Sequence, residues 1–379
     1  MIYFLADDFV LKWLEGPFLY NIRRDDLYEL DEESFCFLKD CINGRESKNT
    51  SFVRYCLNEG ILSQVHRKNE HPPLLRSPEP SLRYLELQIT NRCNLRCKHC
   101  YIEDCNNEEL SIDDIVVILK EFEEMQGLRV LITGGEPLLH TRFDKLNEVL
   151  QAFSVRKVLL SNGLLIDKKI INKLNFQEIQ ISIDGLEESH DAIRGKGTFK
   201  KALDSIRLIM NSGIDVSVAT VVHSKNLGDI DKLKDLLLSM NIKTWTVDIP
   251  CIEGRLRSNE EFVISPEEGG KYLRYGFGDD LHLSSEGFGC GLNLMAVTAR
   301  GDIARCTFYS DRKVGTIRDG LRRCWQRIRP VRLEELKCDC KYRDVCRGGC
   351  RYRAELLTGD PCGKDLYRCS FYNIMSKDG

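Results

Sequence analysis

Three closely spaced cysteines are the feature that most restricts how this chain of 379 residues can fold. Cys93, Cys97 and Cys100 stand at C-x3-C-x2-C spacing, directly after an alternating apolar run at 85–89 that predicts a β-strand. The loop at the C-terminal end of a strand is where α/β enzymes place catalytic groups. Three such thiolates can hold a [4Fe–4S] cluster and leave its fourth iron open for another ligand. Zinc is the main alternative, but zinc sites usually need a second cysteine pair, and Cys105 stands alone.

Strand and helix patterns alternate after this point and predict six βα units between residues 83 and 258. Strands are expected near 85–90, 128–133, 156–161, 178–183, 214–222 and 243–249. Such units form a parallel, partly closed barrel with its site at the C-terminal ends of the strands. Ser111, together with Asp114, and Thr198 are expected to cap two of the helices.

Polar residues and glycines follow three of these strands. They are Gly134, Gly135, Glu136 and Pro137 after the second strand, Ser161 and Asn162 after the third, and Ser182 and Asp184 after the fourth. Two glycines let the backbone approach a ligand closely, and a carboxylate beside them can accept hydrogen bonds from an ammonium group. An ordinary turn explains each element taken alone, but their shared position at strand ends favours one site.

This order of motifs resembles the radical S-adenosylmethionine (SAM) enzymes, whose cluster loop and GGEP element match residues 93–100 and 134–137. The resemblance implies an α/β fold with a partial (β/α)6 TIM-like barrel, and a [4Fe–4S] cluster whose open iron binds the amino and carboxylate groups of SAM. An electron from the cluster, supplied by a reductant such as flavodoxin or ferredoxin, would cleave SAM to methionine and a 5′-deoxyadenosyl radical. That radical would take a hydrogen atom from the substrate.

The resemblance also implies contacts to SAM. Residues 134–137 would contact its amino group, and the polar residues after the third and fourth strands would bind its ribose and carboxylate. Arg194 resembles an arginine that pairs with that carboxylate, a role that suits a guanidinium fork. A surface salt bridge is the other interpretation of Arg194. Thr220 and the pair Gly254-Arg255 match adenine-side positions only loosely.

A second set of cysteines fills the C-terminal part of the chain. It comprises Cys290, Cys306, Cys338, Cys340, Cys346, Cys350, Cys362 and Cys369. The first two bracket a predicted hairpin with Gly301-Asp302 at its turn. A zinc ribbon or knuckle could use four of these thiols. Their order resembles the SPASM extension of radical SAM enzymes, which carries one or two auxiliary iron–sulfur clusters.

By this resemblance, the first auxiliary cluster would be held by Cys290, Cys306 and Cys350, and the second by Cys338, Cys340, Cys346 and Cys369. Two departures affect these assignments. The C-x-C pair at 338–340 replaces the usual C-x2-C and crowds two ligands. Ser284 stands where the family often has a further cysteine, so the first cluster would keep an open iron or take a ligand from Cys362 or the substrate. The remaining cysteines in helical patterns are expected to be core thiols: Cys36, Cys41, Cys56 and Cys324.

Residues 1–68 predict a small α+β unit of winged-helix type. Strands near 10–13, 18–22 and 27–30 precede two helices, capped by Asp31 and Thr50, and a last strand near 61–65. The pattern resembles the precursor-recognition domain of enzymes that modify ribosomally made peptides, in which a leader peptide adds a strand to a sheet edge. An accessory domain that only packs on the enzyme is the alternative.

Prolines mark a linker at 69–82, so the expected order is a peptide-recognition domain at 1–68, the barrel at 83–258, a bridging segment at 259–289 and the SPASM domain at 290–379. A net charge of −3 and the lack of a long apolar run predict no nucleic-acid partner and no membrane partner. Clustered cysteines, 17 in all, without a secretory pattern at the N-terminus predict a cytoplasmic metalloprotein.

Together these features predict a radical SAM peptide maturase. Its substrate would be a ribosomally made precursor peptide with a leader segment, and its product a thioether or carbon–carbon crosslink. An enzyme of tetrapyrrole or quinone-cofactor biosynthesis is the alternative within the family. A non-enzymatic metal-binding scaffold is the alternative from another class.

Overall fold

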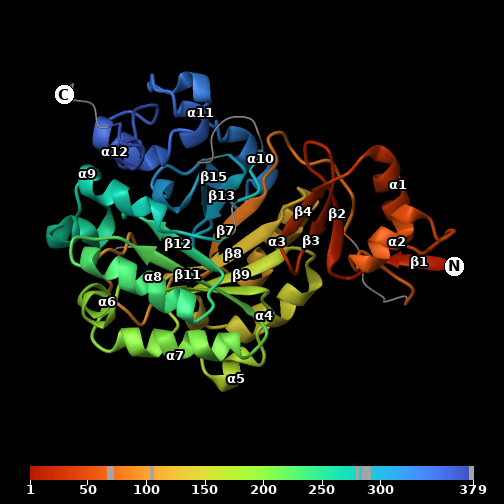
Figure 1. Ribbon diagram of the computed structural model, residues 1–379, viewed down its shortest axis with the longest axis horizontal. Coiled ribbons are helices and arrows are strands. Elements are labelled where there is room, and N and C mark those ends of the chain that lie inside the picture. The colour runs from red at the N-terminus through yellow and green to blue at the C-terminus, as the bar shows by residue number, and fades with distance from the viewer. Residues whose placement is uncertain (66–71, 103–105, 279–280, 284–291, 375–379) are drawn as a thin grey trace.

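A parallel six-stranded sheet forms the centre of the protein in the computed structural model, which describes residues 1–65, 72–102, 106–278, 281–283 and 292–374 (Figure 1). Its strands are β7 (Tyr84–Gln88), β8 (Arg129–Thr133), β9 (Arg156–Ser161), β10 (Glu178–Ser182), β11 (Asp215–Val221) and β12 (Thr244–Asp248). They lie in chain order, and every neighbouring pair is parallel. All six predicted strands are therefore confirmed. Because β7 and β12 do not pair with each other among the described residues, the barrel is partial.

Helices connect these strands and cover the sheet. They are α3 (Ile112–Glu124), α4 (Phe143–Val149), α5 (Lys168–Ile171), α6 (Glu187–Arg194), α7 (Thr198–Met210) and α8 (Ile230–Ser239). Every second residue of β8, Val130 and Ile132, is fully buried in the same apolar core as Ile118 of α3 and Leu146 of α4. Burial of one apolar stripe per element stabilises this arrangement.

The predicted helix caps have different outcomes. The Ser111 hydroxyl accepts the backbone N–H of Asp114 at 3.1 Å, which confirms the cap of α3. The prediction for Thr198 is wrong, because Gly197 is the residue before α7 and Thr198 is its first residue. The carboxylate of Asp191, which lies outside the helix, accepts the N–H of Phe199 at 3.0 Å and so satisfies a free N–H of the first turn.

The sheet continues beyond β7 into the C-terminal part of the chain. Strand β13 (Leu294–Val297) pairs parallel with β7, and β14 (Asp302–Ala304) and β15 (Gly315–Thr316) follow in antiparallel order. The hairpin predicted around Gly301 is confirmed. Its addition to the barrel edge, visible in Figure 1, was not predicted.

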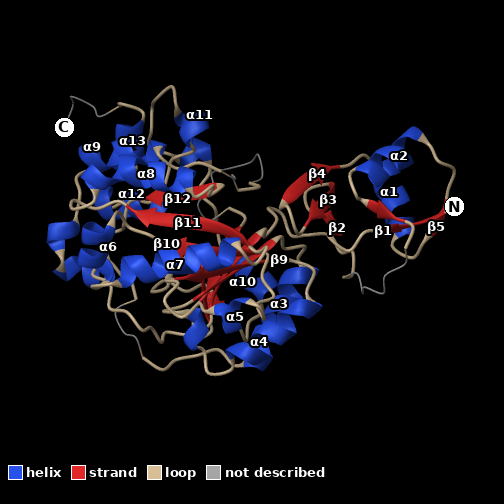
Figure 2. Cartoon of the chain, turned by 60° about the horizontal axis from the view of Figure 1, so that its bottom comes forward, coloured by secondary structure: helices blue, strands red, loops and turns tan. Residues whose placement is uncertain are grey.

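The N-terminal unit contains two three-stranded sheets. One comprises β1 (Ile2–Leu5), β5 (Arg45–Glu46) and β6 (Leu62–Ser63), and the other β2 (Phe9–Trp13), β3 (Pro17–Asn21) and β4 (Asp26–Glu29). Helices α1 (Glu32–Cys41) and α2 (Ser51–Asn58) have the predicted caps, Asp31 and Thr50. Strands β1 and β5 were missed. Figure 2 shows this unit projecting from the barrel, with β2–β4 nearer to it than α1 and α2.

Buried polar contacts fix the β2–β4 sheet to the barrel. Fully buried Lys12 donates from Nζ to the carbonyl of Gly127 at 2.8 Å. Arg156 donates to the carbonyls of Ile22 and Arg23 at 3.1 and 2.6 Å. Arg129 and Arg156 begin β8 and β9, and Arg129 also pairs with Asp25. The N-terminal unit therefore attaches at the N-terminal end of the barrel strands.

Short helices dominate the C-terminal region: α9 (Pro266–Gly269), α10 (Leu321–Arg327), α11 (Arg343–Cys346), α12 (Arg351–Thr358) and α13 (Leu366–Phe371). In Figure 1, α11 and α12 lie on the other side of the molecule from α1 and α2. Cys41, Cys56 and Cys324 are buried as predicted, but Cys36 is exposed on α1. None of the helices described is long and apolar enough to cross a membrane. The predicted domain boundaries stay predictions.

Candidate active site

The three-cysteine loop follows β7 at the C-terminal end of the strands. The thiol of Cys97 is buried, and those of Cys93 and Cys100 are half-buried. Burial, with smaller contributions from the neighbouring thiols of Cys97 and Cys100, raises the pKa of Cys93 to about 12. The three sulfurs therefore lie within electrostatic reach of one another. Metal coordination displaces thiol protons, so this set fits three ligands of an iron–sulfur cluster.

The paired glycines after β8 lie against the beginning of this loop. The N–H of Gly135 donates to the carbonyl of Thr90 at 2.8 Å, and that of Glu136 donates to the carbonyl of Arg92 at 2.7 Å. A Cβ atom on Gly134 would lie 2.5 Å from the Thr90 oxygen, and one on Gly135 would lie 2.4 Å from the Arg92 oxygen. Only glycine permits this approach, which explains both residues.

Glu136 is fully buried and connects two strand ends. Its carboxylate accepts hydrogen bonds from the Ser161 hydroxyl and the Asn162 N–H, both at 2.9 Å. Burial raises the pKa of Glu136 to about 7. The Asn162 amide donates to the side chain of Asn94 in the cysteine loop at 2.8 Å. The structure thus joins Glu136, Ser161 and Asn162 in one network, while Pro137 is buried at the start of a short 3-10 helix.

Asp184 and Arg194 form a buried ion pair beside the cysteine loop. Arg194 donates from Nε to Asp184 at 2.6 Å, and their side chains are 11% and 0% exposed. Arg194 therefore forms a salt bridge, as one interpretation expected, but the pair is buried and not on the surface. Burial alone would raise the pKa of Asp184, but Arg194 and nearby histidines hold it well below its usual value. Ser182 lies at the end of the same strand, β10.

Two further groups lie near the loop: His99, which was not predicted, and Arg255, which the sequence matched only loosely to an adenine-side position. The Nε2 atom of His99 lies 3.8 Å from Asp184, and burial lowers the pKa of His99 to about 3. Arg255 donates from Nε to the carbonyl of Cys97 and from its backbone N–H to the carbonyl of Cys100, both at 3.0 Å. The segment after β12 therefore packs directly on the cysteine loop. The sequence signal for His99 was only its place between two cysteines.

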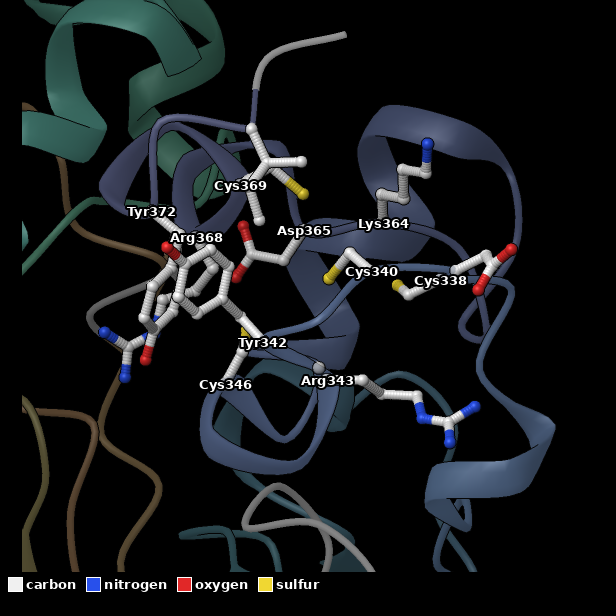
Figure 3. Close-up of a pocket in the computed structure, with 13 residues that line it drawn as sticks. Cys338, Cys340, Tyr342, Arg343, Cys346, Lys364, Asp365, Arg368, Cys369 and Tyr372 are labelled. Atoms are coloured by element: carbon white, nitrogen blue, oxygen red, sulfur yellow. The ribbon is translucent and has the colours of Figure 1, made fainter.

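The second auxiliary group of cysteines comes together in space. Cys338, Cys340, Cys346 and Cys369 line one pocket with Asp365 and Arg368 (Figure 3). The C-x-C spacing does not prevent Cys338 and Cys340 from facing this pocket. Four thiols from three chain segments are a suitable donor set for an iron–sulfur cluster. Cys362 packs beside Cys338, in the region of this second group.

The first auxiliary group is only partly described, because Cys290 and Ser284 lie outside the described residues. Cys306 is buried, and Cys350 packs against the same small apolar cluster. That cluster also contains Cys251, which the sequence analysis did not assign. Among the described residues, no three His, Cys, Asp or Glu side chains are placed to share a single metal ion. A cubane cluster distributes its ligands over four iron atoms, so its thiolates need not meet at one point.

A cavity of about 680 Å³ opens next to the cysteine loop. Tyr101, directly after Cys100, lines it together with Phe308 and Tyr352, whose rings stack with a centroid distance of 5.5 Å. The lining also includes charged residues of both signs: Glu253, Arg257, Arg300, Asp302, Asp311 and Arg312. The cavity lies between the barrel and the C-terminal hairpin and is the natural position for a substrate.

An open parallel α/β barrel with a three-cysteine loop at the C-terminal ends of its strands places the protein among the cofactor-dependent α/β enzymes. Residues 87–237 match the model of the Radical SAM superfamily, so the chain contains a radical SAM domain. Its cofactors are accordingly SAM and a [4Fe–4S] cluster, and its cysteine-rich C-terminal region fits auxiliary clusters of the SPASM type.

Several characterised proteins resemble the chain over most of its length. An AdoMet-dependent heme synthase of Oleidesulfovibrio alaskensis is 26% identical over 340 residues, which cover 76% of this chain and 87% of that protein. The mycofactocin maturase MftC of Mycolicibacterium smegmatis is 28% identical over 319 residues, covering 73% and 80%. The crystal structure of Streptococcus suis SuiB bound to its precursor peptide SuiA has a TM-score of 0.68 at 16% identity, covering 96% of this chain and 98% of that chain.

Proposed function

We propose that this enzyme is a peptide maturase that binds the leader of a ribosomally made precursor and forms a thioether or carbon–carbon crosslink in the attached core peptide. The observation that carries this proposal is the edge of β4. Strand β4 is the outer strand of the β2–β4 sheet, and no strand described pairs with its far side. An open edge on an anchored sheet suits a peptide that adds as a fourth strand.

Register identifies the backbone groups that such a peptide would meet. Pairing runs from Phe18 with Glu29 to Asn21 with Asp26, and Leu30 N–H donates to the carbonyl of Pro17 at 3.0 Å. Hydrogen-bonded and non-hydrogen-bonded pairs alternate in an antiparallel ladder. Glu29 and Leu27 are therefore the residues whose backbone N–H groups point away from β3. These two groups would bind the leader.

The position of this edge sets a requirement on the substrate. The β2–β4 sheet contacts the first residues of β8 and β9, whereas the cysteine loop follows the last residue of β7. The two places are separated by the length of a five-residue strand, roughly 17 Å. A spacer of at least about five extended residues must therefore connect the leader to the modified residue. Such a tether raises the local concentration of the core peptide at the site.

Residues of this chain would hold the cluster and shape the SAM site. Cys93, Cys97 and Cys100 would hold the cluster that supplies one-electron cleavage of SAM and hence hydrogen-atom abstraction. Glu136, Ser161 and Asn162 position the backbone around the SAM site, and the pair Asp184–Arg194 holds α6 against the cysteine loop. The predicted direct SAM contacts of these residues are part of the proposal. The aromatic lining of the cavity would exclude water from the reacting atoms.

The charges of the cavity favour a peptide over a polyanionic substrate. Each arginine that lines it is already in an ion pair: Arg257 with Glu253, Arg300 with Glu108, and Arg312 with Glu355. The cavity therefore offers little uncompensated positive charge. The similarity to SuiB, solved in complex with a precursor peptide, and to the mycofactocin maturase MftC supports a peptide substrate as well.

Tetrapyrrole chemistry is the second candidate. It is favoured by the heme synthases among the relatives, which align with about three quarters of this chain. The same cluster and SAM site would serve it. It would leave the open edge of β4 without a role.

Proline substitution at the β4 edge tests the proposal. Glu29→Pro removes one outward N–H but leaves the hydrogen bonds between β3 and β4, a position at which edge strands tolerate proline. Glu29→Ala is the matched control, because it keeps the N–H and loses the same exposed side chain. The variant should bind and modify the precursor encoded beside the gene at least tenfold more weakly than the control, with unchanged SAM cleavage in the absence of peptide. Equal precursor turnover by both variants would reject leader recognition, and turnover of a tetrapyrrole would establish the second candidate.

A further inference from the structure

Cys251 is a buried thiol beside the described cysteines of the first auxiliary group. It follows β12, is 5% exposed, and belongs to the small apolar cluster against which Cys350 packs. Cys306, which follows β14, belongs to the same buried cluster, and Cys350 lies within its electrostatic reach. Three thiols from three distant segments of the chain thus meet at one place.

The alternative donor for this cluster lies elsewhere. Cys362 packs with Cys338, Leu336 and Val331, and its carbonyl accepts the N–H of Lys337 at 2.8 Å. It therefore belongs to the surroundings of the second group. Ser284, where the family often has a cysteine, lies outside the described residues. Cys251 is the described thiol that contacts the first group without being assigned to it.

A buried network holds the two segments together. Arg353 donates to the carbonyl of Ile249 and to the carboxylate of Asp365, both at 3.1 Å, and also pairs with Asp248. The same carboxylate accepts the N–H of Cys350 at 2.8 Å. Arg353 is 5% exposed, so its positive charge lies in a region of low dielectric close to both thiols. These contacts hold the segment after β12 against the start of α12, and with it Cys251 beside Cys350.

We infer that Cys251 is a ligand of the first auxiliary iron–sulfur cluster, together with Cys306 and Cys350. Each of these three thiols would lose its proton on binding iron. The inference holds for a peptide or a tetrapyrrole substrate, because it concerns only how the cluster is held.

Iron content and spectroscopy of the full-length protein test the assignment. Every variant carries Cys93→Ala, Cys97→Ala and Cys100→Ala, so that the remaining iron belongs to the auxiliary clusters. Adding Cys251→Ala should remove about four irons and four sulfides per chain, or keep the cluster with changed electron paramagnetic resonance (EPR) g values. Cys324→Ala is the control, since it removes a buried thiol in α10 away from both groups. Iron, sulfide and EPR signals equal to those of the control would overturn the inference.

A conservative variant covers the case in which Cys251→Ala does not fold. Cys251→Ser keeps the size of the side chain and replaces sulfur by oxygen. A ligand at this position should then give a shifted reduction potential and altered EPR signal for one auxiliary cluster, with the other unchanged. Identical signals and potentials in the serine variant and its parent would also overturn the assignment.

Discussion

The buried pair Asp184–Arg194 gives the sharpest prediction for stability. Asp184 is fully buried and accepts hydrogen bonds from Arg194 at 2.6 Å and from the N–H of Val221 at 2.8 Å. Asp184→Asn removes the charge and leaves the guanidinium of Arg194 buried without its counterion. Breaking one partner of such a pair typically costs about 3–5 kcal/mol. For a domain of this size, the loss corresponds to a decrease in Tm of roughly 6 to 20 °C.

A double-mutant cycle separates the pair from the rest of the site. Arg194→Met alone should destabilise the protein by a similar amount, whereas Asp184→Asn combined with Arg194→Met should recover most of the loss, because no unpaired charge remains. Asp204→Asn is the matched control: its ion pair with Arg207 is 2.8 Å long, with side chains 60% and 70% exposed. That substitution should change the free energy of unfolding by less than about 1 kcal/mol. Thermal and urea unfolding measured by circular dichroism supply the values. A cost of Asp184→Asn no larger than that of the control, or a coupling energy near zero, would refute the reasoning.

Two further predictions concern the cluster and pH. Replacing Cys93, Cys97 and Cys100 by Ala should abolish formation of 5′-deoxyadenosine, while iron bound by the C-terminal cysteines remains. Chromatography of the products and iron analysis, carried out on one preparation, measure these two results. Persistent SAM cleavage would contradict the assignment. Burial lowers the pKa of Lys12 to about 8, although Glu123 opposes this, so between pH 8 and about 10.5 the unfolded chain binds more protons at this lysine than the folded chain does. The contribution of Lys12 to stability should therefore increase with pH through that window. In Lys12→Met, the free energy of unfolding measured in urea should rise less steeply with pH than in the unmodified protein. Equal slopes of this free energy against pH would reject the buried lysine as the cause.

The barrel and the order of its motifs could be predicted from the sequence because both depend on local patterns. Strand alternation depends on neighbours two residues apart, and each βα unit repeats the same signal. The cysteine loop and the Gly134-Gly135 pair were placed at the C-terminal ends of adjacent strands for the same reason. Helix caps such as Asp31 and Ser111 follow from a side chain and an N–H three residues later. The cap prediction for Thr198 failed because the carboxylate of Asp191, earlier in the chain, accepts the N–H group at the start of this helix.

Other features depend on contacts between distant segments. Strands β1 and β5 are short and pair only across the N-terminal unit, so their few residues carry little local signal. The addition of β13 to β7 joins residues more than 200 positions apart. The partner of Arg194 is Asp184, a residue that the sequence analysis had assigned to a ligand. In each case the partner is set by packing, which no local pattern records.

The cysteines illustrate the difference between features that local spacing predicts and features that depend on tertiary packing. Spacing alone determined that Cys93, Cys97 and Cys100 act together, because three thiols within eight residues cannot lie far apart. Spacing could not connect Cys251 to Cys350, which are about 100 residues apart. Their contact is decided by how the segments after β12 and β14 pack on α12, and by the bridge from Arg353 to Asp248. The sequence by itself determined the class of chemistry, whereas the tertiary structure decided which thiols, charges and sheet edges meet, because those contacts exist only after distant segments have packed together.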